Sequence, residues 1–142
     1  MRCQEIMHRR VCTVRETDNI ALVARTMRDE DIGFMPVLDS DDVVIGTLTD
    51  RDIVVRACVG ADDLRSILVS SIMSRGVVAC RPSDLIESAE KKMREHRITR
   101  LPVIDEEGAL VGVVSLSDVA QYDVPGRVGR TLQAIAERKY AF

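Results

Sequence analysis

The chain contains the stretch Gly46-Thr-Leu-Thr-Asp-Arg-Asp-Ile53, and the same pattern returns 66 residues later as Gly112-Val-Val-Ser-Leu-Ser-Asp-Val119. In both stretches a glycine follows an apolar run, and a hydroxyl side chain stands three residues before an aspartate. This spacing is typical of a capping box, in which the hydroxyl caps the first turn of a helix and the acid reaches back to it. Each stretch therefore predicts a strand that ends where a helix begins, near Thr49 and near Ser115.

The repetition extends beyond these eight residues. With a shift of 66 residues, residues 6–53 align with residues 72–119 without a gap, and 15 of the 48 positions are identical. An internal repeat of this length indicates two copies of one supersecondary unit, neither of which buries its apolar face alone. We therefore expect the two copies to pack on each other around a pseudo-twofold axis.

Each copy predicts the same order of elements, namely helix, strand, helix, strand, strand, helix. A short helix ends near Met7 and near Met73. Asp18 and Asp84 are candidate N-caps of the next helix, in which apolar residues recur at helical spacing. Strands are predicted, from β-rich runs bounded by polar turns, over 11–14, 34–38, 43–48, 77–80, 100–104 and 110–114. The pattern indicates a mixed α/β (α+β) chain made of two units.

Two strand details carry further expectations. The run Val43-Val44-Ile45 is wholly apolar, which favours a strand that is buried on both faces. Pro36 and Pro102 have no backbone N–H to donate to a ladder, so each is expected at the start of a strand or at a sheet edge.

Composition argues against several classes of protein. The chain has 142 residues, of which 46% are apolar and only 3% aromatic, so its core must be aliphatic. The net charge of −3 argues against a nucleic-acid binder, whose affinity comes from basic residues that neutralise phosphates. No apolar run is long enough for a signal peptide or a membrane-spanning helix, so we expect a cytoplasmic protein with no membrane partner.

The residue types that bind metals or perform catalysis are scattered. Cys3, Cys12, Cys58 and Cys80 do not match the spacing of a zinc site, and no metal is predicted. The thiols fit a reducing compartment, either as small buried hydrophobic side chains or, alternatively, as a redox pair. The two histidines have no clustered acids beside them, so no catalytic residues are predicted and the chain is not expected to be an enzyme.

The repeated hydroxyl–aspartate pattern has two compatible interpretations. Thr49 and Asp52 can simply cap a helix. The same geometry can also bind a nucleotide, because the start of a helix favours a phosphate group and a carboxylate accepts hydrogen bonds from both hydroxyls of a ribose. One helical turn can be capped when empty and read by a ligand when occupied.

The sequence resembles the CBS motif, present twice as the tandem pair called a Bateman module. The resemblance rests on Ile-Met before each first strand, on Met-Pro-Val-Leu-Asp with Gly-Thr-Leu-Thr-Asp-Arg-Asp-Ile, and on Leu-Pro-Val-Ile-Asp with Gly-Val-Val-Ser-Leu-Ser-Asp-Val. It covers about residues 1–122. It implies two β-α-β-β-α units packed sheet to sheet, and a ligand such as AMP, ADP, ATP, NAD or S-adenosylmethionine bound in clefts between the motifs as a regulatory signal, with no required cofactor.

The resemblance also assigns site residues. The ribose carboxylates fall on Asp52 and Asp118, and the hydroxyls on Thr49 and Ser115. The positions that meet adenine are Cys12, Thr13, Met35, Val78, Ala79 and Leu101. Some relatives reach the phosphates with an arginine contributed across the repeat interface, here Arg100, whose alternative role is a solvated charge.

Phe34 stands at that arginine's position in the first repeat, and Ser117 stands where the first repeat has Arg51. The resemblance therefore implies two unequal sites, of which the Asp52 site, with Arg51 beside it and Arg100 in reach, is the better suited to a charged ligand.

The predicted organisation is a first motif over 1–58, a linker over 59–70, a second motif over 71–122 and a tail over 123–142. In the tail Val128, Leu132, Ile135 and Ala136 fall on one helical face, which packs either on the module's own surface or on a partner. The resemblance implies a homodimer that regulates a separate protein. The alternatives are a structural dimerisation module that binds no ligand, or a nucleic-acid-binding or catalytic role.

Overall fold

The computed structural model describes residues 1–60 and 63–137, and the chain divides into two units. The first-repeat unit consists of Val11–Val77. The second-repeat unit consists of Met1–Arg10 together with the chain from Val78 onward. Each unit combines strands with helices, which confirms the predicted mixed α/β class.

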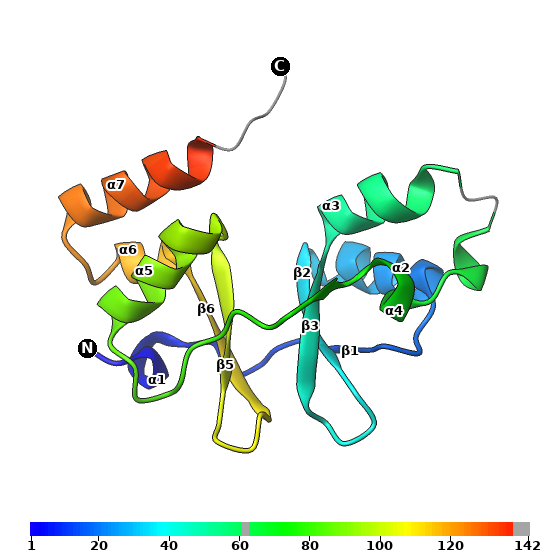
Figure 1. Ribbon diagram of the computed structural model, residues 1–142, viewed down its shortest axis with the longest axis horizontal. Helices are drawn as coiled ribbons and strands as arrows, with labels where there is room; N and C mark the ends of the chain where they lie inside the picture. The colour runs from blue at the N-terminus through cyan, green and yellow to red at the C-terminus, as the bar shows by residue number, and fades with distance from the viewer. Residues whose placement is uncertain (61–62, 138–142) are drawn as a thin grey trace. The chain divides into compact units, whose positions relative to one another are not determined.

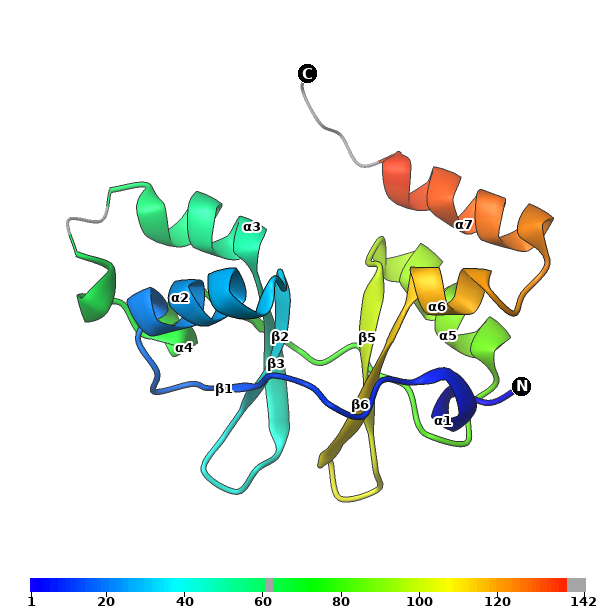
Figure 2. The ribbon, with the colours of Figure 1, turned by 180° about the vertical axis from the view of Figure 1, so that it is seen from behind.

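The first-repeat unit is a four-stranded sheet with helices on one face (Figures 1 and 2). The strands, in sheet order, are β1 (Val14–Arg15), β2 (Phe34–Leu38), β3 (Val44–Thr49) and β4 (Ser74–Arg75). Only β1 and β2 are parallel. The helices are α2 (Ile20–Glu30), α3 (Asp50–Asp52) continued by the π-helix η1 (Ile53–Cys58), the 3₁₀ turn η2 (Leu64–Ser66) and α4 (Val69–Ile72).

The second-repeat unit is built on the antiparallel hairpin β5–β6. Its elements are β5 (Arg100–Ile104), β6 (Leu110–Ser115), α1 (Cys3–Ile6), α5 (Ile86–His96), α6 (Leu116–Ala120) and α7 (Pro125–Ala136). Cys80 bridges Val103 in parallel and His8 bridges Val113 in antiparallel fashion. These two bridges stand where the first-repeat unit has the strands β1 and β4.

The opening segment of each sequence repeat packs in the unit formed by the other repeat. Helix α1 and His8 belong to the second-repeat unit, whereas helix α4 and Ser74 belong to the first-repeat unit. Ile6 is buried in the core of the second-repeat unit, and Ile72 is buried in the core of the first-repeat unit. The repeat visible in the sequence is therefore not the unit that buries a core.

The buried face of each long helix matches the predicted helical spacing. Ile20, Val23 and Met27 are buried on α2. On α5 the equivalent residues Ile86, Ala89 and Met93 are buried together with the polar Glu90. The aliphatic and methionine side chains of each unit form one cluster, as the shortage of aromatic residues predicts.

The helix starts correct one prediction. Asp18 and Asp84 are not the N-caps, which are Asn19 and Leu85. The two aspartates instead accept from the N–H groups of Arg15 and Arg81, at 2.8 and 2.9 Å. The first helical N–H groups are satisfied by the packed opening segments, because Ile20 N–H donates to the carbonyl of Ile67 and Ile86 N–H to that of Met1.

The first predicted strand of each repeat is also largely wrong. Within 11–14 only Val14 is in a strand, and within 77–80 only Cys80 makes a bridge. The strands over 34–38 and 100–104 are confirmed to the residue, and β3 and β6 end at the two hydroxyl residues. Strand formation in the first element is limited to the residues that find a partner on β2 or β5.

Strand β3 is buried on one face rather than on both. Val44, Gly46 and Leu48 are buried and alternate with partly exposed residues. The two prolines lie inside their strands, not at a start. Pro36 lies on β2, between β1 and β3, which contradicts the prediction, whereas Pro102 lies on β5, an edge strand of the β5–β6 sheet, which agrees with it. The carbonyl of Pro102 accepts the N–H of Cys80 at 3.0 Å. The nitrogen of Pro102 has no proton to donate, but no ladder bond is lost, because pairing with the first element begins only at Cys80.

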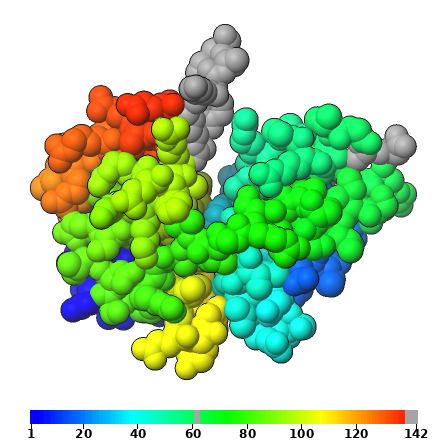
Figure 3. All heavy atoms as spheres, in the orientation of Figure 1, coloured from blue at the N-terminus to red at the C-terminus, as the bar shows by residue number. Residues whose placement is uncertain are grey.

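The tail forms a helix that packs on its own unit. Figure 3 shows the orange-red atoms of α7 against the yellow-green atoms of α5. The face toward the core consists of Val128, Thr131 and Ile135, whereas Leu132 is 56% exposed and Ala136 is exposed, which corrects part of the predicted face. The predicted tail residues 138–142 and the linker residues 61–62 lie outside the described residues.

The cysteines are free thiols in different environments. Cys3 and Cys80 are buried in the core of the second-repeat unit, Cys12 is partly buried and Cys58 is exposed. The neighbouring Cys3 thiol, together with burial, raises the pKa of the Cys80 thiol. Among the described helices, none is both long and apolar enough to span a membrane.

Candidate functional site

The candidate site in the first-repeat unit is the turn that joins β3 to α3. Thr49 Oγ1 accepts from the N–H of Asp52 at 3.2 Å, and Asp52 Oδ2 accepts from the N–H of Thr49 at 2.9 Å. This reciprocal pair is the predicted capping box, and it fixes the orientation of the Asp52 carboxylate. We call it the first-repeat frame.

The second-repeat frame has the same geometry. Ser115 Oγ accepts from the N–H of Asp118 at 3.1 Å, and Asp118 Oδ2 accepts from the N–H of Ser115 at 2.8 Å. The hydroxyl of Ser115 lies 2.6 Å from the same oxygen and can donate to it. The sequence repeat has thus preserved one local structure in both units.

The frames differ at the second carboxylate oxygen. His8 Nε2 lies 2.9 Å from Asp118 Oδ1. Because a carboxylate only accepts hydrogen bonds, Nε2 carries the proton in this contact. In the first-repeat frame, Arg56 Nε lies 3.9 Å from Asp52 Oδ1, which is an ion-pair distance and too long for a hydrogen bond.

The hydrogen bonds of the second-repeat frame favour the charged form of the Asp118 carboxylate. Burial raises the pKa of Asp118, but hydrogen bonds from Ser115 and His8 outweigh burial and leave that pKa below its ordinary value. The Asp118 side chain is only 13% exposed, whereas the His8 side chain is 70% exposed. The imidazole therefore lies at the surface, with its bond to the carboxylate directed inward.

The positions that the resemblance assigned to adenine fall into two groups. The side chains of Met35 and Leu101 are fully buried in the two cores, so only their backbones could meet a ligand. The remaining positions are exposed or partly buried, and these are Cys12, Thr13, Val78 and Ala79. Contact of any of these positions with adenine stays a prediction.

The predicted arginines lie beside the frames of their own units. Arg51 follows Asp50 on α3, and its N–H donates to the Asp50 carboxylate at 2.8 Å. Arg100 is the register partner of Ser115. The cavity next to Ser115 has a volume of about 320 Å³, and it is lined by Thr99, Arg100, Ser115, Leu116, Ser117, Ala120, Val128 and Leu132. Helix α7 thus forms one wall beside the second-repeat frame.

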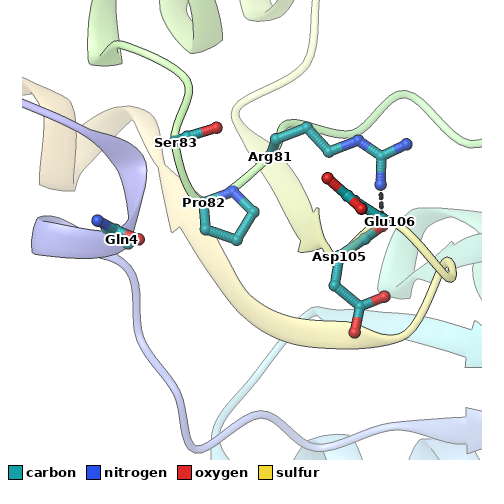
Figure 4. A pocket seen from close by; sticks show the side chains of 6 residues that line it. All are labelled: Gln4, Arg81, Pro82, Ser83, Asp105 and Glu106. Carbon is teal, nitrogen blue, oxygen red and sulfur yellow. Dashed lines mark hydrogen bonds between the residues drawn. The ribbon is translucent and has the colours of Figure 1, made fainter.

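A larger cavity of the second-repeat unit has a volume of about 510 Å³, and no residue of the second-repeat frame lines it (Figure 4). It is lined by Gln4, Arg81, Pro82, Ser83, Asp105 and Glu106. Arg81 there donates to the carbonyl of Asp105, and Arg15 makes the same bond to the carbonyl of Asp39, at 2.6 Å, in the other unit. Because the equivalent bond occurs in both repeats and holds a hairpin turn, we assign Arg15 and Arg81 a structural role.

Metal ligands do not gather in the described part of the chain. Within residues 1–60 and 63–137, no group of three or more His, Cys, Asp and Glu side chains is placed to hold a metal ion. The residue that sequence reasoning missed is His8, which is 110 residues from its partner Asp118. The only sequence signal is the repeat itself, which aligns His8 with Ser74 and so shows that the two copies differ at this position.

Two repeated α/β units, each with a hydroxyl–carboxylate frame at a strand–helix junction, define a tandem-repeat module. The chain belongs to the CBS-domain family, whose model matches residues 3–57 and 69–124. This finding confirms the resemblance of the two sequence repeats to CBS motifs.

Relatives of similar length share about a third of the sequence. The chain is 36% identical to the CBS domain-containing protein YhcV of Bacillus subtilis, over 82% of this chain and 81% of that protein. It is 32% identical to hypoxic response protein 1 of Mycobacterium tuberculosis, over 84% and 82%. The crystal structure of hypoxic response protein I with two coordinated zinc ions matches with a TM-score of 0.78 and 31% identity, over 87% of this chain and 99% of that one.

Other solved structures share the fold at lower identity. A conserved CBS domain protein of unknown function from Thermoplasma acidophilum matches with a TM-score of 0.86 and 20% identity, over 99% of this chain and 79% of that one. The CBS domain pair of protein MJ0100, in complex with 5′-methylthioadenosine and S-adenosyl-L-methionine, matches with a TM-score of 0.75 and 21% identity, over 85% and 94%.

The chain spans 61% of an uncharacterised protein of Methanopyrus kandleri, and 23% of the homoserine O-acetyltransferase of Methanohalobium evestigatum. The shared region is therefore a minor part of that enzyme.

Proposed function

We propose that the chain is a regulatory module that binds an adenosine-containing ligand through the first-repeat frame and modulates a partner protein. The observation that supports this proposal most is the Asp52 carboxylate. One of its oxygens is fixed by Thr49 at 2.9 Å, while the other is 3.9 Å from Arg56. A carboxylate held in this way has an oxygen to accept hydrogen bonds from a ribose diol.

The fold supports the same class of ligand. The CBS pair of protein MJ0100 is described in complex with 5′-methylthioadenosine and S-adenosyl-L-methionine. The candidates for this chain are AMP, ADP, ATP, NAD and S-adenosylmethionine, which share an adenosine with two ribose hydroxyls. We propose a regulatory rather than a catalytic role, since the frame provides recognition groups without a nucleophile–base pair.

A thermal-shift panel of these five ligands tests the proposal. A ligand at about 100 times its dissociation constant stabilises the native state by roughly 2.7 kcal/mol, which moves the melting midpoint by several degrees. Asp52→Ala should abolish that shift. Asp118→Ala is the matched control, because it removes the same cap in the other unit and should leave the shift in place.

A ligand-free interaction module is the second candidate. It is favoured by Phe34, which stands at the position of Arg100, and by the second-repeat frame, whose two carboxylate oxygens are bonded within the unit. If none of the five ligands raises the melting midpoint, while a cooperative melt proves that the protein is folded, this candidate is favoured over the first.

The assembly and partners belong to the proposal as well. We propose a homodimer that acts in the cytoplasm on a separate regulated protein. Light scattering tests the dimer, and a mass corresponding to one chain would reject it.

A further inference from the structure

The bond between His8 and Asp118 is built into the backbone of the second-repeat unit. The N–H of His8 donates to the carbonyl of Val113, and the N–H of Val113 donates to that of His8, both at 2.9 Å. The close approach requires Gly112, since a Cβ there would lie 2.9 Å from the carbonyl oxygen of His8. The imidazole is therefore positioned at Asp118 by a backbone segment that is hydrogen-bonded to β6.

The first-repeat unit has the same pairing with a different side chain. Ser74 stands opposite Thr47, as His8 stands opposite Val113, and both positions are equivalent under the 66-residue repeat. A Cβ on Gly46 would lie 2.4 Å from the carbonyl oxygen of Ser74, so the close approach is repeated too. The two units thus present a histidine and a serine at one structural position.

This difference changes how many acceptor sites each carboxylate offers. Oδ2 is used by the capping box in both frames. In the second-repeat frame Oδ2 of Asp118 already accepts from both the N–H and the hydroxyl of Ser115, which fills its two acceptor positions. A ribose diol there needs both positions of Oδ1, and His8 occupies one of them at 2.9 Å. Because the His8 side chain is 70% exposed, the bond itself, rather than packing, keeps the ring over the carboxylate.

We propose that His8 is a selectivity residue that closes the second-repeat frame to a ribose diol, so that the chain binds one adenosine ligand rather than two. This inference rests on the proposed function of the first-repeat frame. It adds a residue outside the frame motif as the determinant of the inequality between the two sites.

Titration calorimetry with ATP and with S-adenosylmethionine as probes tests the inference through stoichiometry. We expect one site per chain for the natural sequence and two for His8→Ser, which places in the second-repeat unit the residue that the first has. The double variant His8→Ser/Asp118→Ala should return to one site. His8→Ala provides a second opening variant, and a thermal melt of each variant verifies folding.

The reciprocal variant Ser74→His is the matched control. It places an imidazole at the equivalent position of the first-repeat unit, where it should weaken binding by tenfold or more. The natural chain with two sites, or opened variants that still bind one, would overturn the role of His8 while leaving the proposed function standing.

If neither probe binds the natural chain or any opened variant, the proposed function fails and this inference fails with it. Binding that emerges only after His8→Ser would support the closing role of His8 and reject the role of Asp52.

Discussion

The hydroxyl of Thr131 on α7 donates to Glu90 Oε1 on α5 at 2.6 Å, and both residues are completely buried. Arg94 donates to the same hydroxyl oxygen at 2.9 Å. Glu90 Oε2 has no hydrogen-bond partner among the described residues. Burial of polar groups in a core costs free energy unless they are hydrogen-bonded. The bonds of Thr131 to Glu90 and Arg94 therefore stabilise the packing of α7 on α5.

Thr131→Val should loosen α7, because it keeps the shape of the side chain but removes the donor to Glu90 and the acceptor for Arg94. We expect the free energy of unfolding to fall by about 1–3 kcal/mol, measured by urea denaturation. Leu132→Ala, at a residue that is 56% exposed on the same helix, should change it by less than about 0.5 kcal/mol. Equal effects of the two substitutions would contradict the anchoring role.

Glu90→Gln should stabilise the protein more at high pH than at low pH. Burial and the neighbouring Asp123 raise the pKa of Glu90, so the folded chain holds that proton more tightly than the unfolded chain. Stability is then lost as pH rises from about 4.3, the ordinary value, through the raised folded value. The glutamine has no charge to bury.

The melting midpoints of Glu90→Gln and the natural chain should therefore diverge as pH rises above about 4.3, the ordinary carboxyl value. Burial also acts on Asp123, but the neighbouring Glu90 together with the N–H of Val124 and the Arg127 guanidinium leaves the pKa of Asp123 below its ordinary value, so Asp123 titrates at lower pH. Glu95→Gln, at an exposed position of α5, is the control. A gap that stays constant with pH would be evidence against a raised pKa at Glu90.

Gly46→Ala should destabilise the first-repeat unit, because the new Cβ would lie 2.4 Å from the backbone oxygen of Ser74. Overpacking of this kind costs about 1–3 kcal/mol. Gly129→Ala, on α7 with no atom within 4 Å of the new Cβ, should instead gain up to about 1 kcal/mol from helix propensity. Chemical denaturation measures both, and effects of the same sign would refute the close approach.

Asp118→Asn should flatten the acid limb of the stability curve. The pKa of Asp118 is lowered on folding, so its contribution is complete above about 3.9, the ordinary value, and is lost as pH falls through the folded value. Urea unfolding at pH 6 and at pH 3 should show a smaller loss for the variant than for the natural chain. Parallel losses would show that the bonds of Ser115 and His8 do not favour the charged carboxylate.

The sequence predicted local structure correctly wherever a few neighbouring residues determine that structure. Thr49 and Ser115 cap their helices as the capping-box spacing predicts, and β2 and β5 occupy the predicted residues. The N-caps at Asp18 and Asp84 were mispredicted for a physical reason. The first N–H groups of the helices donate to the carbonyls of Ile67 and Met1, groups that are remote in the sequence. At α2 the side chain of Asn19, rather than Asp18, caps the N–H of Leu22, and at α5 Leu85 offers no side-chain cap.

The amino-acid sequence by itself determined the repeat, the class of fold, the two frames and the family, because each depends on residue types at short or regular spacing. Only the tertiary structure decided which segment completes which unit, since that choice depends on cores formed by distant residues. It brought His8 to Asp118, 110 residues away, and it placed Ser74 at the equivalent position of the other unit. The two frames are alike in sequence, and contacts between remote segments make them different.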